Sequence, residues 1–227
     1  IITSKFRRNN AQQFEESFGE ATPNIYYLGI GKPTAYGTKT RPDGRTENIG
    51  TDSAPVTPAD SVQDEYDVFD DLLAAKRITS SDVSFACPRI NWTTGTTYDI
   101  YRHDYGERIT GTTNQQSSNG GVFNLYDASF YVLNSARNVY KCLDNNNNAI
   151  STVEPTGTNT SIILSTADGY RWKYMYTLSA SEQSNFLSTD FMAVSTNSSV
   201  SGNAIDGSID IIKIKTPGSG GADGTHT

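Results

Sequence analysis

The chain has 227 residues with 18 basic and 25 acidic side chains, a net charge of −7, and a mean hydropathy of −0.51. Its 27 Thr, 24 Ser and 18 Asn, together with 13 Tyr and 9 Phe, are typical of polar-faced strands joined by many turns. No apolar run approaches the ~18 residues of a membrane span, and the acidic balance without a Lys/Arg block argues against nucleic-acid binding. We therefore expect neither a membrane nor a nucleic-acid partner.

The first part of the chain predicts two helices separated by a strand and a long loop. A helix begins after Thr3 or Ser4, since Ala11, Phe14 and Phe18 fall on one face. Residues 25–30 predict a buried strand, and residues 31–60, rich in Gly, Pro and Thr, predict a long loop. A second helix is predicted over residues 60–77 from an apolar stripe at helical spacing, made by Val62, Tyr66, Phe69 and Leu73.

From residue 83 onward the apolar period changes to two, which predicts strands. Residues 130–133 and 139–143 predict a hairpin, and further strands are predicted at 191–194 and 208–215. Ser179 and Glu182 have capping-box spacing, which predicts a short helix to about residue 187. The clearest strand follows Asp168-Gly169 and places five apolar residues on one face: Tyr170, Trp172, Tyr174, Tyr176 and Leu178.

These elements predict a mainly β (α+β) fold, an antiparallel β-sandwich with two or three short helices and long loops. We expect residues 1–80 to form a helix, strand, long loop and second helix that pack on the sandwich. Residues 81–200 should form the sandwich core, and residues 201–227 the start of a further β-rich extension or a linker. The two cysteines, Cys87 and Cys142, are too few for a disulfide framework or a four-ligand zinc site, and are expected to be buried and reduced.

The sequence contains no recognisable catalytic or metal-binding motif. A hydrolytic triad would depend on His103, because the other histidine, His226, lies in a Gly-rich stretch. Asp144, Asn146 and Asn148 match the first positions of a calcium loop, but Ala149 stands where that loop needs glycine, so an Asn-rich turn is favoured. We expect no enzyme activity, no cofactor and no metal.

The aromatic residues of the strand at 170–178 allow two interpretations. An exposed ladder of Tyr and Trp could bind sugars, as in a carbohydrate-binding tail module or adhesin. Alternatively, this face is the core of the sandwich, which we favour because strands bury one face. A glycan-cleaving enzyme would need a carboxylate pair in a groove, and nothing in the spacing of Asp99, Asp104 and Glu107 selects such a pair.

Four segments in series resemble the baseplate wedge subunit encoded by gene 8 of T-even-like contractile-tailed bacteriophages. The residues that carry the resemblance are Ile2-Thr3-Ser4-Lys5-Phe6-Arg7 with the helix that follows, Pro88-Arg89-Ile90-Asn91-Trp92, Val139-Tyr140-Lys141-Cys142-Leu143-Asp144, and Asp168-Gly169-Tyr170-Arg171-Trp172-Lys173-Tyr174. Their order and spacing cover residues 2–195. The inserts at 31–60 and 93–121, and the sequence after residue 201, depart from the family pattern.

The resemblance implies a non-enzymatic structural protein of the virion tail baseplate, assembled in the cytoplasm of the bacterial host. It also implies a homodimer within each wedge that contacts the arm subunits, the central trunk subunits and the peripheral pin-like trimer. In this role the protein joins neighbouring wedge subunits and takes part in the baseplate rearrangement that triggers tail contraction. As interface residues that could meet oppositely charged neighbours, we predict Arg41, Arg45, Asp64, Glu65, Asp67, Asp70 and Asp71.

Overall fold

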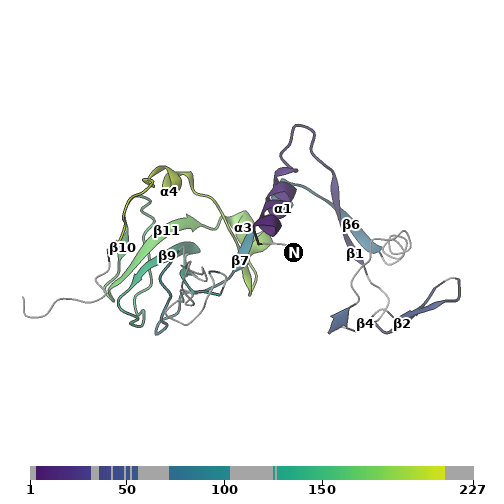
Figure 1. The fold of residues 1–227 in the computed structure, drawn as a ribbon, viewed down its shortest axis with the longest axis horizontal. Coiled ribbons are helices and arrows are strands. Elements are labelled where there is room, and N and C mark those ends of the chain that lie inside the picture. The colour runs from purple at the N-terminus through teal and green to yellow at the C-terminus, as the bar shows by residue number, and fades with distance from the viewer. Residues whose placement is uncertain are drawn as a thin grey trace, which may run out of the picture. The chain divides into compact units, whose positions relative to one another are not determined.

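A computed structural model describes residues 4–31, 36–41, 43–48, 50–51, 53–55, 72–102, 125 and 127–212. The chain divides into two compact units, Ile1–Ser84 and Phe85–Thr227. In both units most of the described elements are antiparallel strands, accompanied by short helices, which confirms the mainly β fold class (Figure 1). The predicted packing of residues 1–80 on the sandwich and the separate segment 201–227 stay predictions.

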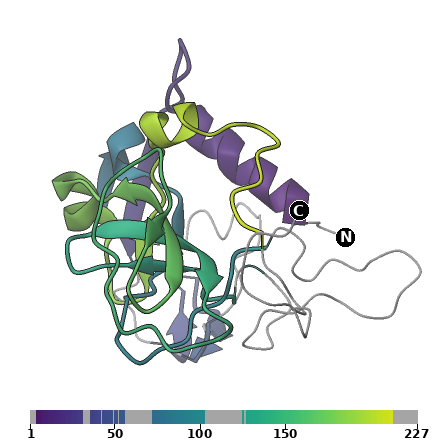
Figure 2. The same cartoon turned by 90° about the vertical axis from the view of Figure 1, so that its left-hand side faces the viewer.

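The predicted first helix and first strand are both present in the first unit, as α1 (Ser4–Glu16) and β1 (Tyr26–Gly31), and the end of α1 packs on the start of β1. The rings of Phe14, Phe18 and Tyr26 lie 4.9 to 5.2 Å apart, in mostly edge-on contacts. The buried Ser17 hydroxyl donates to the Phe14 carbonyl at 2.7 Å and lies 3.0 Å from the Tyr26 hydroxyl. Figure 2 shows α1 from the side, in purple.

Strand β1 pairs with β6 (Leu72–Ile78), a segment that the sequence assigned to a second helix. That prediction was wrong for residues 72–77, while residues 60–71 lie outside the described part of the chain. Leu, Ala, Lys and Arg are good helix formers, and pairing with β1 overrides their local preference. The prediction that β1 is buried was also wrong, because five of its six residues are exposed.

A short 3-10 helix, η1 (Ser80–Asp82), follows β6 and is held by the carboxylate of Asp82. That carboxylate accepts from Lys76 Nζ at 2.6 Å and from the Thr79 backbone N–H at 2.9 Å. The hydrogen bonds from Lys76 and Thr79 lower the pKa of Asp82 to about 2. The end of β6 is therefore fixed by a local charged cap.

Within the predicted long loop 31–60 the chain forms two short hairpins. One pairs β2 (Thr38–Thr40) with β3 (Thr46–Asn48), and the other pairs β4 (Gly50–Thr51) with β5 (Ala54–Pro55). The prediction of a long loop was therefore wrong for the residues of these four strands. The strands are two or three residues long, too short to show a recognisable alternation.

The second unit is built on a four-stranded antiparallel sheet in the order β10-β11-β9-β8. Its strands are β8 (Tyr131–Leu133), β9 (Asn138–Asn145), β10 (Leu164–Ser165) and β11 (Tyr170–Thr177). The predicted hairpin is present as β8 and β9, and the long strands β9 and β11 lie side by side (Figure 1). Strand β11 alternates between buried and more exposed residues, as its sequence predicts.

A two-stranded sheet, β7 (Ala86–Pro88) with β12 (Phe191–Ala193), completes the core of the second unit. Residues from both sheets form one apolar cluster, in which Leu133, Val139, Tyr176 and Leu178 contact Met192 and Ala193. Helix α3 (Ala180–Phe186) carries the predicted capping box between Ser179 and Glu182. Helix α4 (Ser198–Gly202), capped by Asn197, was not predicted, and the predicted strand at 208–215 is absent from residues 208–212.

The segment Pro88-Arg89-Ile90-Asn91-Trp92 joins the two sheets. Leu133 exchanges backbone hydrogen bonds with this segment, donating to the Ile90 carbonyl at 2.7 Å and accepting from the Trp92 N–H at 2.9 Å. The Trp92 indole N–H donates to the Ser151 hydroxyl at 3.1 Å. The segment therefore continues from β7 along the edge of β8.

The aromatic face of β11 lies in the core, which confirms the interpretation of this face as core and not as an exposed sugar-binding ladder. Trp172 has no exposed surface, stacks on Tyr170 at 5.4 Å and 15°, and meets Tyr98 edge-on at 5.6 Å. Its indole N–H has no hydrogen-bond acceptor among the described residues. Cys142 is buried in the same cluster, Cys87 is half-buried, and neither of these two described cysteines forms a disulfide.

The turn before β11 is organised by the carboxylate of Asp168. One oxygen accepts from Ser151 Oγ and from the backbone N–H groups of Thr152 and Val153 at 2.8 to 3.0 Å, and the other accepts from Thr166 Oγ1 at 2.5 Å. Burial raises the pKa of Asp168, but the hydrogen bonds outweigh it and bring the pKa to about 2. Gly169 has φ +83°, and a Cβ there would lie 2.7 Å from the Asn146 side chain, so the turn requires glycine.

We predict that Asp168→Asn lowers the free energy of unfolding by about 2 kcal/mol at pH 7, because charge-assisted hydrogen bonds are replaced by weaker ones. The ionised carboxylate contributes fully to the free energy of unfolding above the ordinary Asp pKa of about 4. This contribution is lost as the pH falls to the lowered pKa of about 2. Thermal unfolding of wild type and variant should therefore converge between pH 4 and pH 2. The exposed Asp206→Asn is the matched control, and an equal loss in both variants would contradict the prediction.

Candidate functional site

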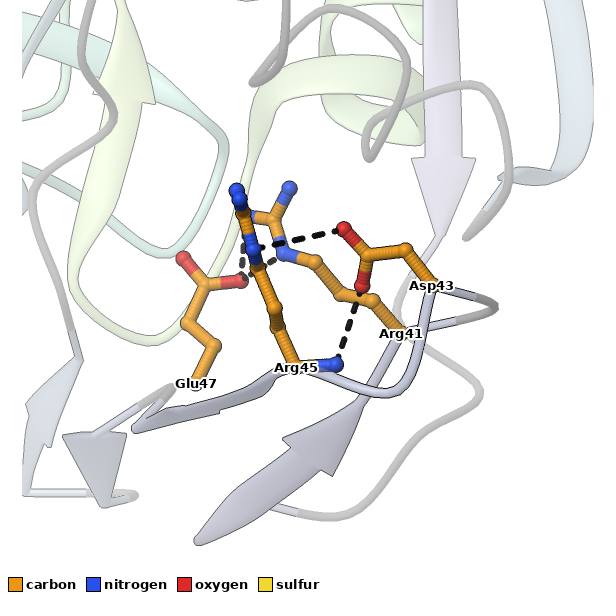
Figure 3. Close-up of polar contacts among 4 residues, drawn as sticks. All are labelled: Arg41, Asp43, Arg45 and Glu47. Carbon is orange, nitrogen blue, oxygen red and sulfur yellow. Dashed lines mark hydrogen bonds and ion pairs between the residues drawn. The ribbon is translucent and has the colours of Figure 1, made fainter.

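The predicted basic interface residues Arg41 and Arg45 both lie at the turn of the β2–β3 hairpin (Figure 3). The turn is closed by the Arg41 N–H donating to the Arg45 carbonyl at 2.8 Å and the Gly44 N–H donating to the Arg41 carbonyl at 2.9 Å. Gly44 adopts φ +82°, a conformation that residues with a Cβ rarely adopt. The Asp43 carboxylate accepts the Arg45 backbone N–H at 3.0 Å.

Arg41 acts within the hairpin. Its Nε and Nη2 donate to one carboxylate oxygen of Glu47 at 3.0 and 2.5 Å, and only 14% of its side chain is exposed (Figure 3). Glu47 neutralises the guanidinium charge, so little of that charge is offered to a neighbour. Arg41 therefore holds the hairpin together through Glu47, and its predicted contact with a partner stays a prediction.

Arg45 is the more exposed of the two arginines of the hairpin. Its side chain is 85% exposed, and its Nε lies 3.7 Å from the Asp43 carboxylate, beyond hydrogen-bond distance. Exposed pairs of this kind contribute little to stability. Arg45 can therefore turn from Asp43 to a carboxylate of a neighbouring protein at little cost.

The predicted acidic interface residues Asp64, Glu65, Asp67, Asp70 and Asp71 lie outside the described part of the chain, so their proximity to the hairpin stays a prediction. The sequence analysis missed a second kind of exposed surface, the apolar side chains of β1 and β6. Tyr27, Leu28, Ile30 and Leu73 are each more than half exposed. The apolar run at residues 25–30 was interpreted as a strand buried within the chain, although such a run equally predicts a surface that another protein covers.

The residues considered for catalysis or metal binding have structural roles where they are described. Asp99 is buried and accepts the Ser129 backbone N–H at 2.9 Å. Asn146 donates to the Asp168 carbonyl, and the Asn148 side chain accepts from Asn145, as befits an Asn-rich turn with three successive residues at positive φ. Within the described ranges, no group of three or more His, Cys, Asp or Glu is arranged to hold a metal ion.

Two further features of the described part bear on function. Trp172 and its neighbours are buried, so the sequence feature that favoured sugar binding is not available to a ligand. None of the described helices has the length and apolar character to cross a bilayer.

We predict that Arg41→Ala increases the hydrogen-exchange rate of the hairpin amides about threefold, because the ion pair with Glu47 is lost. Arg45→Ala should leave these rates unchanged, since Arg45 is exposed and loosely paired. Mass-spectrometric exchange on the two variants measures the difference. An equal increase of the exchange rates in both variants would contradict the prediction that Arg41 stabilises the hairpin and Arg45 does not.

Comparison with known proteins adds one match. The family model described as Bacteriophage T4, Gp8, a baseplate wedge protein, matches residues 1–150. This range contains both surfaces described above, the β2–β3 hairpin and the exposed strands β1 and β6. No curated protein matches the chain.

Proposed function

Since the chain belongs to the Gp8 family of baseplate wedge proteins and is a structural component of the phage tail baseplate, we propose that it joins neighbouring wedge subunits. In this proposal it serves as a non-catalytic connector. The single observation that carries the proposal is that the apolar strands and the charged hairpin of the first unit are exposed, while the polar network around Asp168 in the second unit is satisfied within that unit. Outward apolar and charged groups suit contacts between proteins.

The proposed partners are the arm subunits, the central trunk subunits and the peripheral pin-like trimer, with the protein forming a homodimer within each wedge. Arg45 is proposed to meet a carboxylate of one of these neighbours, and the acidic residues between 64 and 71 to meet basic ones. Exposed charges at the rim of an interface set the orientation and rate of association more than its affinity. The apolar strands would then supply most of the binding energy.

We expect that infection by a phage lacking this chain leaves partial wedge complexes and no complete baseplates, because a connector is missing. Negative-stain electron microscopy of lysates measures this. Adding the purified chain to the lysate should restore complete baseplates, and Arg45→Glu should restore fewer of them than Arg45→Lys. Complete baseplates assembled without the chain would contradict the connector role.

The protein is also proposed to take part in the baseplate rearrangement that triggers contraction. Close-packed interiors are not continuously deformable, so the β core of the second unit should move as a rigid body. Changes are expected instead at contacts made by residues 31–60 and 93–121. Electron cryomicroscopy of extended and contracted tails should give superimposable backbones for β8, β9 and β11, whereas large distortion within that sheet would refute the proposal.

A further inference from the structure

Strands β1 and β6 form a ribbon that is not extended by any third strand among the described residues. Tyr27, Leu28 and Ile30 of β1 are 67%, 53% and 57% exposed, and Leu73 of β6 is 66% exposed. Neighbours along a strand point to opposite faces, so Tyr27 lies on one face and Leu28 and Ile30 lie on the other. Apolar surface is therefore presented on both sides of β1.

A two-stranded ribbon is at best marginally stable in water, and an open apolar edge is a template for another strand. Proteins usually protect such edges with charged residues or proline. Strand β6 carries Lys76 and Arg77, whereas β1 has neither a charged residue nor a proline from Tyr26 to Gly31. The outer edge of β1 is thus the unprotected one.

The charges of the ribbon indicate the chemistry of its partner. Both ionised residues of the two strands are cations, and Lys76 is already paired with Asp82 at 2.6 Å. Arg77 lies opposite Tyr27 and on the same face, and its guanidinium has no hydrogen bond or ion pair to the rest of the described chain. A strand added beside β1 would lie two strand spacings, about 10 Å, from β6, a gap that an arginine and a glutamate side chain can span together.

We propose that the outer edge of β1 accepts an extended segment of another baseplate protein as an added strand. Alternate apolar residues of that segment pack beside Leu28 and Ile30, and a carboxylate on its other face pairs with Arg77. Backbone hydrogen bonds to β1 provide affinity, and the side-chain pattern provides specificity. This inference rests on the proposed connector function and assigns a surface to it.

The test uses a phage lacking the gene, complemented with the full-length chain. In Leu28→Lys/Ile30→Lys two cations replace the apolar side chains that the added strand would cover. We expect about a tenfold lower content of the chain in purified tails, by quantitative mass spectrometry, because the lysines resist burial. The matched control, Ile205→Lys/Ile209→Lys, changes two isoleucines that are 77% and 75% exposed and lie outside the ribbon, and should be incorporated normally.

Circular dichroism and the thermal midpoint of each purified variant establish whether it is folded. If the β1 variant is unfolded, Arg77→Gln provides the second variant. Its incorporation should be lower than that of wild type at low salt and should fall less steeply as salt rises, because the ion pair that salt screens is missing. Normal incorporation of a folded β1 variant overturns the inference while leaving the connector function intact. Complete baseplates without the chain would instead overturn the connector function.

The identity of the added strand is tested with a photo-crosslinking phenylalanine derivative in place of Tyr27. In purified tails we expect cross-links to one segment of another tail protein that alternates apolar residues and carries an acidic one. Cross-links to a second copy of this chain, to another segment of the same chain, or to no peptide at all overturn the proposal. The same derivative in place of Phe191, which is 49% exposed on β12, is the positional control.

Discussion

The carboxylate of Asp168 is the interaction on which the second unit most depends. It gathers residues 151–153, Thr166 and the first residue of β11 around a single half-buried charge. Because Tyr170 and Trp172 follow directly, the position of this turn determines where the aromatic face enters the core. The segment Asp168-Gly169-Tyr170-Arg171-Trp172 therefore combines an anchor, a glycine turn and the largest core side chain, which gives the family resemblance at these residues a structural basis.

Local patterns predicted the second unit well. The alternation from Tyr170 to Leu178, the hairpin around residues 134–137 and the capping box at Ser179 depend on neighbours in sequence, and all three are present. Residues 72–77 were assigned to a helix because Leu73 continues an apolar stripe at helical spacing, and only pairing with the distant strand β1 makes this segment a strand. The strand expected at 208–215 has the composition of a strand, but residues 208–212 have no partner strand in the described chain.

The interface residues illustrate a different limit of sequence analysis. Arg41 and Arg45 look equivalent in the sequence, yet the register of a three-residue hairpin strand places Glu47 beside Arg41 and leaves Arg45 outside. Composition can therefore predict a charged loop but cannot say which charge is already neutralised. Similarly, an apolar strand predicts burial without specifying whether the covering surface belongs to the same chain. Strand β1 is apolar, yet the described residues leave five of its six residues exposed.

The burial of Trp172 has a practical consequence for studying the two units separately. The chain has two tryptophans, Trp92 and Trp172, and both belong to the unit Phe85–Thr227. Indole fluorescence therefore reports on that unit alone, with Trp172 contributing a blue-shifted emission that moves to the red when the core opens, while far-ultraviolet dichroism sums over both units. Coincident transitions in the two signals would mean one cooperative molecule, and separate transitions would mean that the unit bearing β1 unfolds by itself.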